Sequence, residues 1–320
     1  MKHLLTPAGL ALGLASCTTS DQTFAPKIPG PAASVTRSEA ISIVEAYAKT
    51  CWIAEKRHSF HGEDRDKIKV STPDAHKGGG FWKVDHINFG MPYKWGGFDT
   101  PRSFKTGLQR GRFAGDISSP HKRKNLRAAV SKEAVGIDCS GLISRAWRLK
   151  RPHSTRDLPN ICTKLESWDE LQPGDVLNLF NGHVVMFAGW KDRGQYMDGY
   201  EAGPYSGWRV SESVLRISYL KNQGYVPLRY RNIRKDGELR KPADPPLTIP
   251  ALAESPPFRP APPEEPVQPA KIADPAKSLT PEKPAAAAPP SEADPLPPAQ
   301  IIMRSKLKRK SMSRRLKRTP

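Results

Sequence analysis

The stretch Val135-Gly-Ile-Asp-Cys-Ser-Gly-Leu-Ile-Ser-Arg-Ala-Trp147 decides how the fold is interpreted, because it predicts a helix that begins at a cysteine. Asp138 is a preferred N-cap residue, and apolar residues follow at helical spacing, so the helix is expected to run to about Leu149. The first turn of a helix offers unpaired N–H groups and the positive end of the macrodipole. Both favour a thiolate at Cys139. An isolated cysteine is more often an inert packing residue. Other residues of the chain are therefore needed to distinguish a reactive thiolate from a buried inert thiol.

His183 is the candidate base for this thiol. It begins a strand predicted over 182–190, which follows the turn Pro173-Gly-Asp175 and a first strand. A neutral imidazole can take the thiol proton, and the resulting thiolate–imidazolium pair can attack a carbonyl. The imidazole needs an orienting group, and the next predicted strand offers both Asp198 and Glu201. Their odd spacing places them on opposite faces of that strand, so only one of them can face the imidazole.

An N-terminal helix and a later series of strands are predicted around this pair. Thr36 and Glu39 indicate a capping box before an apolar face, so a helix is expected from there to about Ala54. Residues 55–80 indicate a loop, and the latter half of the basic segment 98–134 favours a helix. Strands are expected over 176–180, 182–190, 196–202, 208–210 and 224–231. Helices followed by antiparallel strands predict an α+β fold.

Four motifs occur in a fixed order along the chain. They are Tyr93-Lys-Trp-Gly-Gly97, Asp138-Cys-Ser-Gly-Leu142, Pro173-Gly-Asp175 and Gly182-His-Val184. Together they resemble the NlpC-type cysteine peptidases, a papain-like group that cuts peptidoglycan stem peptides, over roughly residues 90–210. The resemblance implies a nucleophile-bearing helix packed on an antiparallel sheet that carries the base.

The resemblance also implies roles for individual residues. Cys139 would be the nucleophile and His183 the general base. Tyr93 would lend its hydroxyl to the oxyanion, beside the backbone N–H of the cysteine at the helix N-terminus. Asp138 and Ser140 would help to bind the amine of a peptide substrate. No Cys/His spacing in the chain indicates a metal site, and no cofactor is expected.

Two features depart from that family. Its third residue is usually His, Asn or Gln, whereas the best-matching position here holds Glu201, with Asp198 as the alternative orienter. The segment 98–136 is strongly basic and much longer than the few residues usual there. We expect this insertion to lie beside the cleft and to dock an anionic substrate or shield the site. Neutralising Lys122 to Lys124 should then raise the KM for wall fragments.

The N-terminus has the features of a bacterial export signal, with a basic start and a short apolar run that cannot span a bilayer. Leu14-Ala-Ser-Cys17 resembles a lipobox, which implies cleavage before Cys17 and acylation of that residue. Residues 1–17 are therefore assigned to the signal peptide and lipidation site, and 18–35 to a linker. Thr18 after the cysteine favours an outer-membrane lipoprotein, so the chain is expected in the periplasm and cell envelope.

The remaining chain is predicted to contain one domain and two unfolded segments. Residues 36–233 are long enough for one buried core. Residues 234–303 are expected to be disordered, since 19 of the 33 prolines fall between 241 and 300. The basic tail 304–320 contributes nine Lys and Arg residues to a net charge of +19. Such charge favours anionic envelope polymers or lipids as partners, and export argues against nucleic acid.

The sequence leaves two questions open. Cys51 and Cys162 either form a disulfide or remain buried free thiols. The favoured function is an envelope-anchored cysteine hydrolase, a γ-D-glutamyl-diamino acid endopeptidase or related amidase, whose partners are peptidoglycan peptides. One alternative is a non-catalytic wall-binding lipoprotein on the same fold. The other is a papain-like amidase or thioesterase with a non-wall substrate.

Overall fold

The fold is given by a computed structural model that describes residues 25–77 and 79–237. The predicted signal peptide with its lipidation residue Cys17, nearly all of the Pro-rich segment and the basic tail 304–320 lie outside the described residues. Among residues 25–77 and 79–237, none of the helices combines the length and the hydropathy that a membrane span requires.

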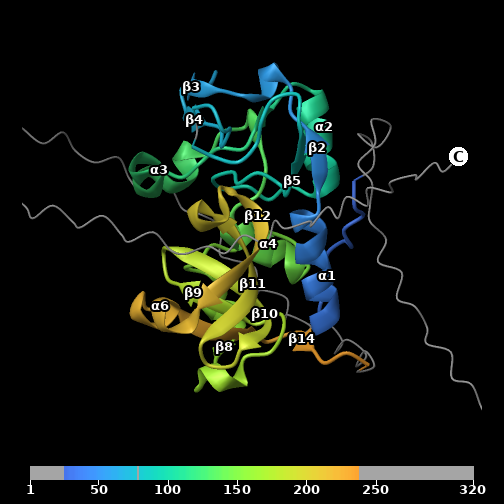
Figure 1. Cartoon of the computed structure of the whole chain (residues 1–320), viewed down its shortest axis with the longest axis vertical. Helices are drawn as coiled ribbons and strands as arrows, with labels where there is room; N and C mark the ends of the chain where they lie inside the picture. Colours follow the sequence, from blue (N-terminus) through green and yellow to red (C-terminus); the bar gives the residue numbers. More distant parts are fainter. Residues whose placement is uncertain (1–24, 78, 238–320) are drawn as a thin grey trace, which may run out of the picture. The chain divides into compact units, whose positions relative to one another are not determined.

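The second half of the described chain forms a six-stranded antiparallel sheet (Figure 1). The strands run in the order β12-β11-β10-β9-β13-β8. They are β8 (Cys162–Lys164), β9 (Val176–Leu179), β10 (His183–Asp192), β11 (Tyr196–Gly203), β12 (Arg209–Arg216) and β13 (Val226–Tyr230). Four consecutive residues of β10, Val184 to Phe187, are buried, so both faces of the sheet are covered. The five predicted strands are all present, although β12 is much longer than expected.

Two helices pack against this sheet and against each other. They are α1 (Arg37–Ala48) and α4 (Cys139–Ala146), which lie along the sheet in Figure 1. The predicted capping box is confirmed, with Thr36 and Glu39 bonded reciprocally. The predicted end of α1 near Ala54 is wrong, because Cys51–Ile53 leave the helix and form β2, which pairs with β5 (Ile87–Phe89). The α+β prediction is confirmed.

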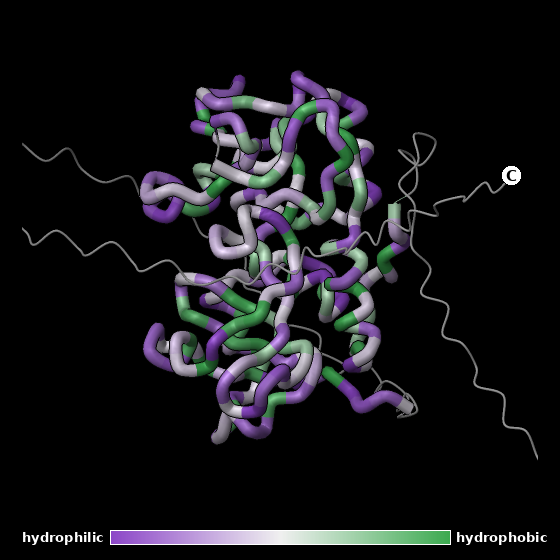
Figure 2. Tube along the Cα trace, viewed as in Figure 1, coloured by the Kyte–Doolittle hydropathy of each residue, from purple (hydrophilic) through white to green (hydrophobic). Residues whose placement is uncertain are grey.

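The polar segment between these helices has more structure than its composition indicates. Residues 55–80 are not a plain loop: they form a 3-10 turn and a hairpin. The basic insertion is helical in its first half as well as in its second. The elements are η2 (Lys56–His58), β3 (His61–Glu63), β4 (Lys69–Ser71), α2 (Pro101–Gln109), β6 (Phe113–Ala114), α3 (Pro120–Asn125), η3 (Leu126–Ala129) and β7 (Ala134–Val135). In Figure 2 many hydrophobic residues lie along the strands of the sheet, whereas these segments contain more hydrophilic residues.

Short elements complete the described chain. They are β1 (Val35–Thr36), α5 (Leu158–Ile161), η4 (Trp168–Glu170), η5 (Pro204–Ser206), α6 (Ile217–Asn222) and β14 (Ile233–Arg234). Strands β1 and β14 pair in parallel and join the two ends of the domain. Cys162 is a buried free thiol, so the pairing with Cys51 that the sequence left open does not form.

The β3–β4 hairpin is held by a polar network around Asp74. His61 Nε2 lies 2.5 Å from Asp74 Oδ2, and its Nδ1 lies 3.0 Å from Ser71 Oγ. Burial alone would raise the pKa of Asp74, but hydrogen bonds from the Lys77 backbone, Thr72 and His61 lower it to about 2. Ser71, His61 and Asp74 are thus joined as a hydroxyl, an imidazole and a carboxylate. This network holds the loop that follows the hairpin.

Candidate active site

Helix α4 presents Cys139 at its first residue. The Asp138 side chain accepts a hydrogen bond from Gly141 N at 2.6 Å and another from Ser140 Oγ at 3.0 Å, which confirms the predicted N-cap. Cys139 is 8% exposed, which is low for a nucleophile, but it lines a pocket. The helix ends at Ala146, slightly before the predicted Leu149, and the buried Trp147 follows as its C-cap.

Glycines allow the segment after Tyr93 to touch the first turn of α4. A Cβ atom at Gly141 would collide with the carbonyl oxygen of Gly97, and a Cβ at Gly97 would lie 2.6 Å from the carbonyl oxygen of Gly136. Asp138 N also donates to the Gly97 carbonyl at 3.3 Å. This close backbone approach explains why two sequence motifs, far apart along the chain, meet at the cysteine.

His183 and Glu201 meet on neighbouring strands of the sheet. Strands β10 and β11 pair Met186 with Tyr200, which places His183 and Glu201 diagonally on one face. His183 Nε2 lies 2.8 Å from Glu201 Oε2. The Glu201 side chain is 1% exposed, and its Oε1 has no hydrogen-bond partner among the described residues. The charge of this buried carboxylate is therefore directed at the imidazole.

Asp198 does not reach the imidazole. It pairs with Gly189 on β10, six residues along the strand from His183, which corresponds to about 20 Å. The alternative orienter considered from the sequence is thus excluded by the register of the two strands, and Glu201 occupies that position.

The imidazole of His183 interacts with Cys139 and Glu201. Burial alone would lower the pKa of His183, but the charge of Cys139, hydrogen bonds with Cys139 and Glu201, and the charge of Glu201 raise it to about 10. The ring is thus bonded to a sulfur on one side and to a carboxylate on the other. This is the geometry of a proton relay from a thiol to a base with an orienting acid.

The pocket that contains Cys139 and His183 has a volume of about 200 Å³. Tyr93 lies in its wall and stacks edge-on against Trp208, with ring centroids 5.1 Å apart. Burial raises the pKa of the Tyr93 hydroxyl well above its usual range, and the charges of Cys139 and Asp138 raise it further. Tyr93 therefore remains a neutral hydrogen-bond donor beside the sulfur.

Several pocket residues were not found from the sequence. Four of them are aromatic (Tyr205, Trp208, Tyr219 and Tyr225), and nothing in their local sequence distinguishes these four from core residues. The residues not found are Ser118, Arg123, Leu179, Gly203, Pro204, Tyr205, Trp208, Tyr219, Gln223 and Tyr225, and Gly182 of the predicted Gly182-His-Val184 motif lines the pocket with them. Ser118 and Arg123 belong to the insertion, so the insertion does border the cleft. Asp138 and Ser140, which were expected to bind a substrate amine, bond to each other and are not among the described residues that line this pocket.

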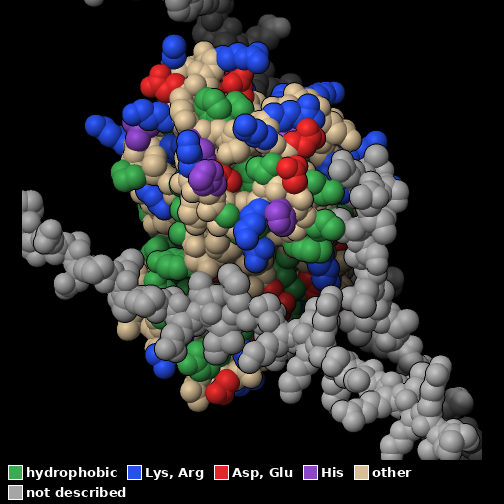
Figure 3. Space-filling view, turned by 45° about the horizontal axis from the view of Figure 1, so that its top comes forward, with side chains coloured by type: hydrophobic (Ala, Val, Ile, Leu, Met, Phe, Trp, Pro, Cys, Tyr) green, Lys and Arg blue, Asp and Glu red, His purple; other side chains and the backbone are tan. Residues whose placement is uncertain are grey.

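The three consecutive basic residues of the insertion, 122–124, differ in burial. Lys122 is 3% exposed, and its Nζ lies 2.6 Å from Asp116 Oδ2, so it is part of a buried ion pair rather than a docking surface. Arg123 and Lys124 are exposed. Figure 3 shows Lys and Arg side chains spread over the face that includes this part of the fold, with fewer acidic side chains between them.

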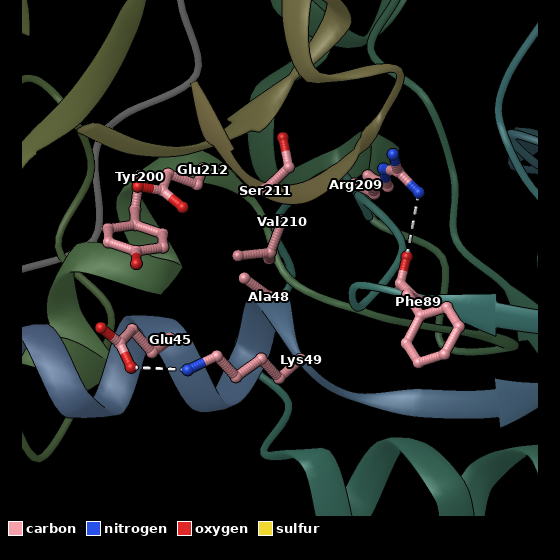
Figure 4. A pocket seen from close by; sticks show the side chains of 9 residues that line it. All are labelled: Glu45, Ala48, Lys49, Phe89, Tyr200, Arg209, Val210, Ser211 and Glu212. Atoms are coloured by element: carbon pink, nitrogen blue, oxygen red, sulfur yellow. Dashed lines mark hydrogen bonds and ion pairs between the residues drawn. The ribbon is translucent and has the colours of Figure 1, made fainter. Parts of the chain in front are cut away.

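A second pocket lies between α1 and β12 and has a volume of about 240 Å³ (Figure 4). Its charged walls are mostly engaged: Glu45 pairs with Lys49 at 2.8 Å, and Arg209 Nη1 donates to the Phe89 carbonyl at 3.2 Å. It contains no thiol or imidazole. Within residues 25–77 and 79–237, no group of three His, Cys, Asp or Glu side chains is arranged to hold a metal ion.

Comparisons of the chain with protein-family models, with curated proteins and with solved structures found no match. The functional assignment therefore depends on the motifs and on the geometry of Cys139, His183 and Glu201.

Proposed function

We propose that the chain is a papain-like cysteine hydrolase that cleaves amide bonds in peptidoglycan stem peptides. The observation that carries this proposal is the hydrogen-bonded series Cys139–His183–Glu201, whose sulfur opens onto a pocket. The substrate class comes from the resemblance of the four motifs to NlpC-type peptidases. Acylation of Cys17 would hold the enzyme at the envelope, where that substrate occurs.

The proposed reaction begins from a thiolate–imidazolium pair, because the raised pKa of His183 places the proton of the Cys139 thiol on the ring. The thiolate attacks the carbonyl carbon, and the electron pair of the C=O bond moves to oxygen. As this oxyanion collapses, the imidazolium gives its proton to the leaving amine, and a thioester remains on the sulfur. His183 then takes a proton from water, which attacks the thioester and releases the acid. Glu201 holds the imidazole and stabilises its positive charge throughout.

Two donors are available for the oxyanion. The first N–H groups of α4 have no intrahelical acceptors, and the backbone N–H of Cys139 is among them. The Tyr93 hydroxyl lies in the same pocket wall as the sulfur. Because Tyr93 stays protonated, it can donate to a developing negative charge.

Incubation with purified muropeptides tests the proposal. We expect mass spectrometry to show hydrolysis of the bond between γ-D-glutamate and the diamino acid, and alkylation of Cys139 to abolish it. The control is the same protein alkylated after a bound substrate has protected the thiol. Intact muropeptides together with tight binding to wall material would instead indicate a non-catalytic binding protein.

Replacing Glu201 by glutamine should change the pH profile of hydrolysis. Loss of the carboxylate charge removes one of the two groups that keep the His183 pKa near 10. The imidazolium would then lose its proton at lower pH, and we expect the alkaline limb of kcat/KM to move down by about one pH unit or more. The rate at the optimum should fall by about 10- to 100-fold. A pH titration of hydrolysis of a muropeptide measures both.

Asp198→Asn is the matched control for this prediction. It removes a carboxylate from the same strand, but one that is about 20 Å from the imidazole. The pH profile of this variant should coincide with that of the unmodified chain. A profile that shifts in Asp198→Asn and not in Glu201→Gln would contradict the proposed role of Glu201.

A further inference from the structure

Arg123 is a cation of the insertion that reaches the wall of the catalytic pocket. It belongs to α3 and is exposed, and its Nη2 lies 3.5 Å from the Oγ of Ser118, which lines the same pocket. No salt bridge joins Arg123 to an acidic residue within the described parts of the chain. No Asp or Glu is present among the described residues that line this pocket. The guanidinium therefore faces a cavity with no protein carboxylate to neutralise it.

The structure beneath Arg123 fixes its position. The preceding residue, Lys122, is buried, and its Nζ bonds both Asp116 Oδ2 and the carbonyl of Ala129. Neighbouring residues of a helix point in directions about 100° apart, so Arg123 is not buried with Lys122 and instead lines the pocket. Trp95 Nε1 also donates to the carbonyl of Leu126 at 3.1 Å and ties the end of α3 to the segment that carries Tyr93.

The charge of Arg123 acts inside the catalytic site. It opposes burial and the charge of Cys139 in setting the pKa of the Tyr93 hydroxyl, so the guanidinium lies within electrostatic range of that group. An anionic group of a bound substrate that lies close to the reacting carbonyl would be attracted by the same charge. A guanidinium with an adjacent hydroxyl matches the geometry of a carboxylate, which can accept hydrogen bonds from both.

We propose that Arg123 and Ser118 form a carboxylate-binding subsite, so that the preferred substrates are amides that carry a free carboxylate close to the scissile bond. This inference rests on the proposed function, and it assigns the insertion a role in substrate selection. Arg123 is a specificity-determining residue here and takes no part in the transfer of the proton.

Two alkylating reagents of nearly equal size test this subsite without requiring hydrolysis. Iodoacetate carries a carboxylate, whereas iodoacetamide is neutral, and both react with the same thiol. The ratio of their rate constants at Cys139, measured by mass spectrometry of the labelled peptide, cancels changes in the reactivity of the sulfur. We expect Arg123→Gln to lower the iodoacetate-to-iodoacetamide ratio by about five- to tenfold, and Ser118→Ala to lower it less.

Lys124→Gln is the matched control, because it removes the same charge from the next residue of α3, which does not line the pocket. Its ratio should remain that of the unmodified chain. Hydrolysis of a substrate with the carboxylate, but not of its carboxamide analogue, should show a raised KM with little change of kcat in Arg123→Gln. A reactive thiol whose ratio is equal in Arg123→Gln and Lys124→Gln would overturn the subsite alone. A thiol inert to both reagents would overturn the proposed function as well.

Discussion

Replacing Cys139 by alanine should reduce kcat/KM for muropeptides by at least about 10⁴-fold, because it removes the sulfur that forms the proposed covalent intermediate. The fold should be unchanged, since the side chain is small and lies at the first residue of α4. Hydrolysis is followed by mass spectrometry, and circular dichroism checks the fold. Binding of the substrate should survive, so the variant should retain affinity for muropeptides that it cannot cut.

Cys162 provides the matched control for this substitution. It is also a buried free thiol, but it lies on β8, and burial raises its pKa to about 12. The Cys162→Ala variant should therefore hydrolyse muropeptides at the rate of the unmodified chain. If hydrolysis persisted in Cys139→Ala, the proposed chemistry would be wrong. The next nucleophile to test would be Ser71, which lies beside His61 in the hairpin network.

The meeting of Cys139 and His183 at the candidate site could be predicted because its signals are local. Asp138 caps the helix that begins at the next residue, Cys139. His183 begins a strand directly after a turn. Each of these features depends on hydrogen bonds and periodicity within a short window. The choice between Glu201 and Asp198 was of a different kind. Alternation showed that only one could face the imidazole, but the register between β10 and β11 had to be known to say which.

The segment before the cysteine could not be predicted because its contacts are between distant residues. The three residues of β2, at Cys51–Ile53, leave α1 because they pair with β5, more than 30 residues later. In the same way Phe113 and Ala114 form β6 by pairing with Ala134 and Val135. Strands of two or three residues carry no periodicity of their own, so tertiary pairing decides them. The expected loop over 55–80 is wrong for a different reason: β3 and β4 pair locally, but each has only three residues, too few to show a strand pattern.

Lys122 shows how a charge run can mislead. In the sequence it is one of three consecutive basic residues, and solvated docking is the ordinary interpretation of such a run. The structure buries its ammonium against Asp116, whose carboxylate also accepts from Ser71 N at 3.1 Å. Asp116 N donates to the Tyr93 carbonyl at 2.8 Å, so the ion pair supports the segment that carries Tyr93, the proposed oxyanion donor. Its contribution is therefore to the stability of the site.

Lys122→Met should destabilise the fold by about 3–5 kcal/mol, because it leaves the carboxylate of Asp116 buried without its cation. Burial already raises the pKa of Asp116 to about 6, against the opposing effect of Lys122. Without the lysine the pKa should rise further, so that the folded state binds a proton which the unfolded state releases above pH 4. The free energy of unfolding should then fall as the pH rises above 4. Urea unfolding at several pH values measures this.

Two variants distinguish the effect of losing the Lys122–Asp116 ion pair from the effect of losing one positive charge of residues 122–124. Lys124→Met removes an equal charge from an exposed position of α3 and should change the free energy of unfolding by less than about 0.5 kcal/mol. Asp116→Asn in the Lys122→Met background should recover part of the loss, since the buried charge is then absent. If Lys122→Met were as stable as the unmodified chain and only its KM for wall fragments increased, the docking role expected from the sequence would be correct. The ion pair would then contribute little to holding Tyr93 in the pocket.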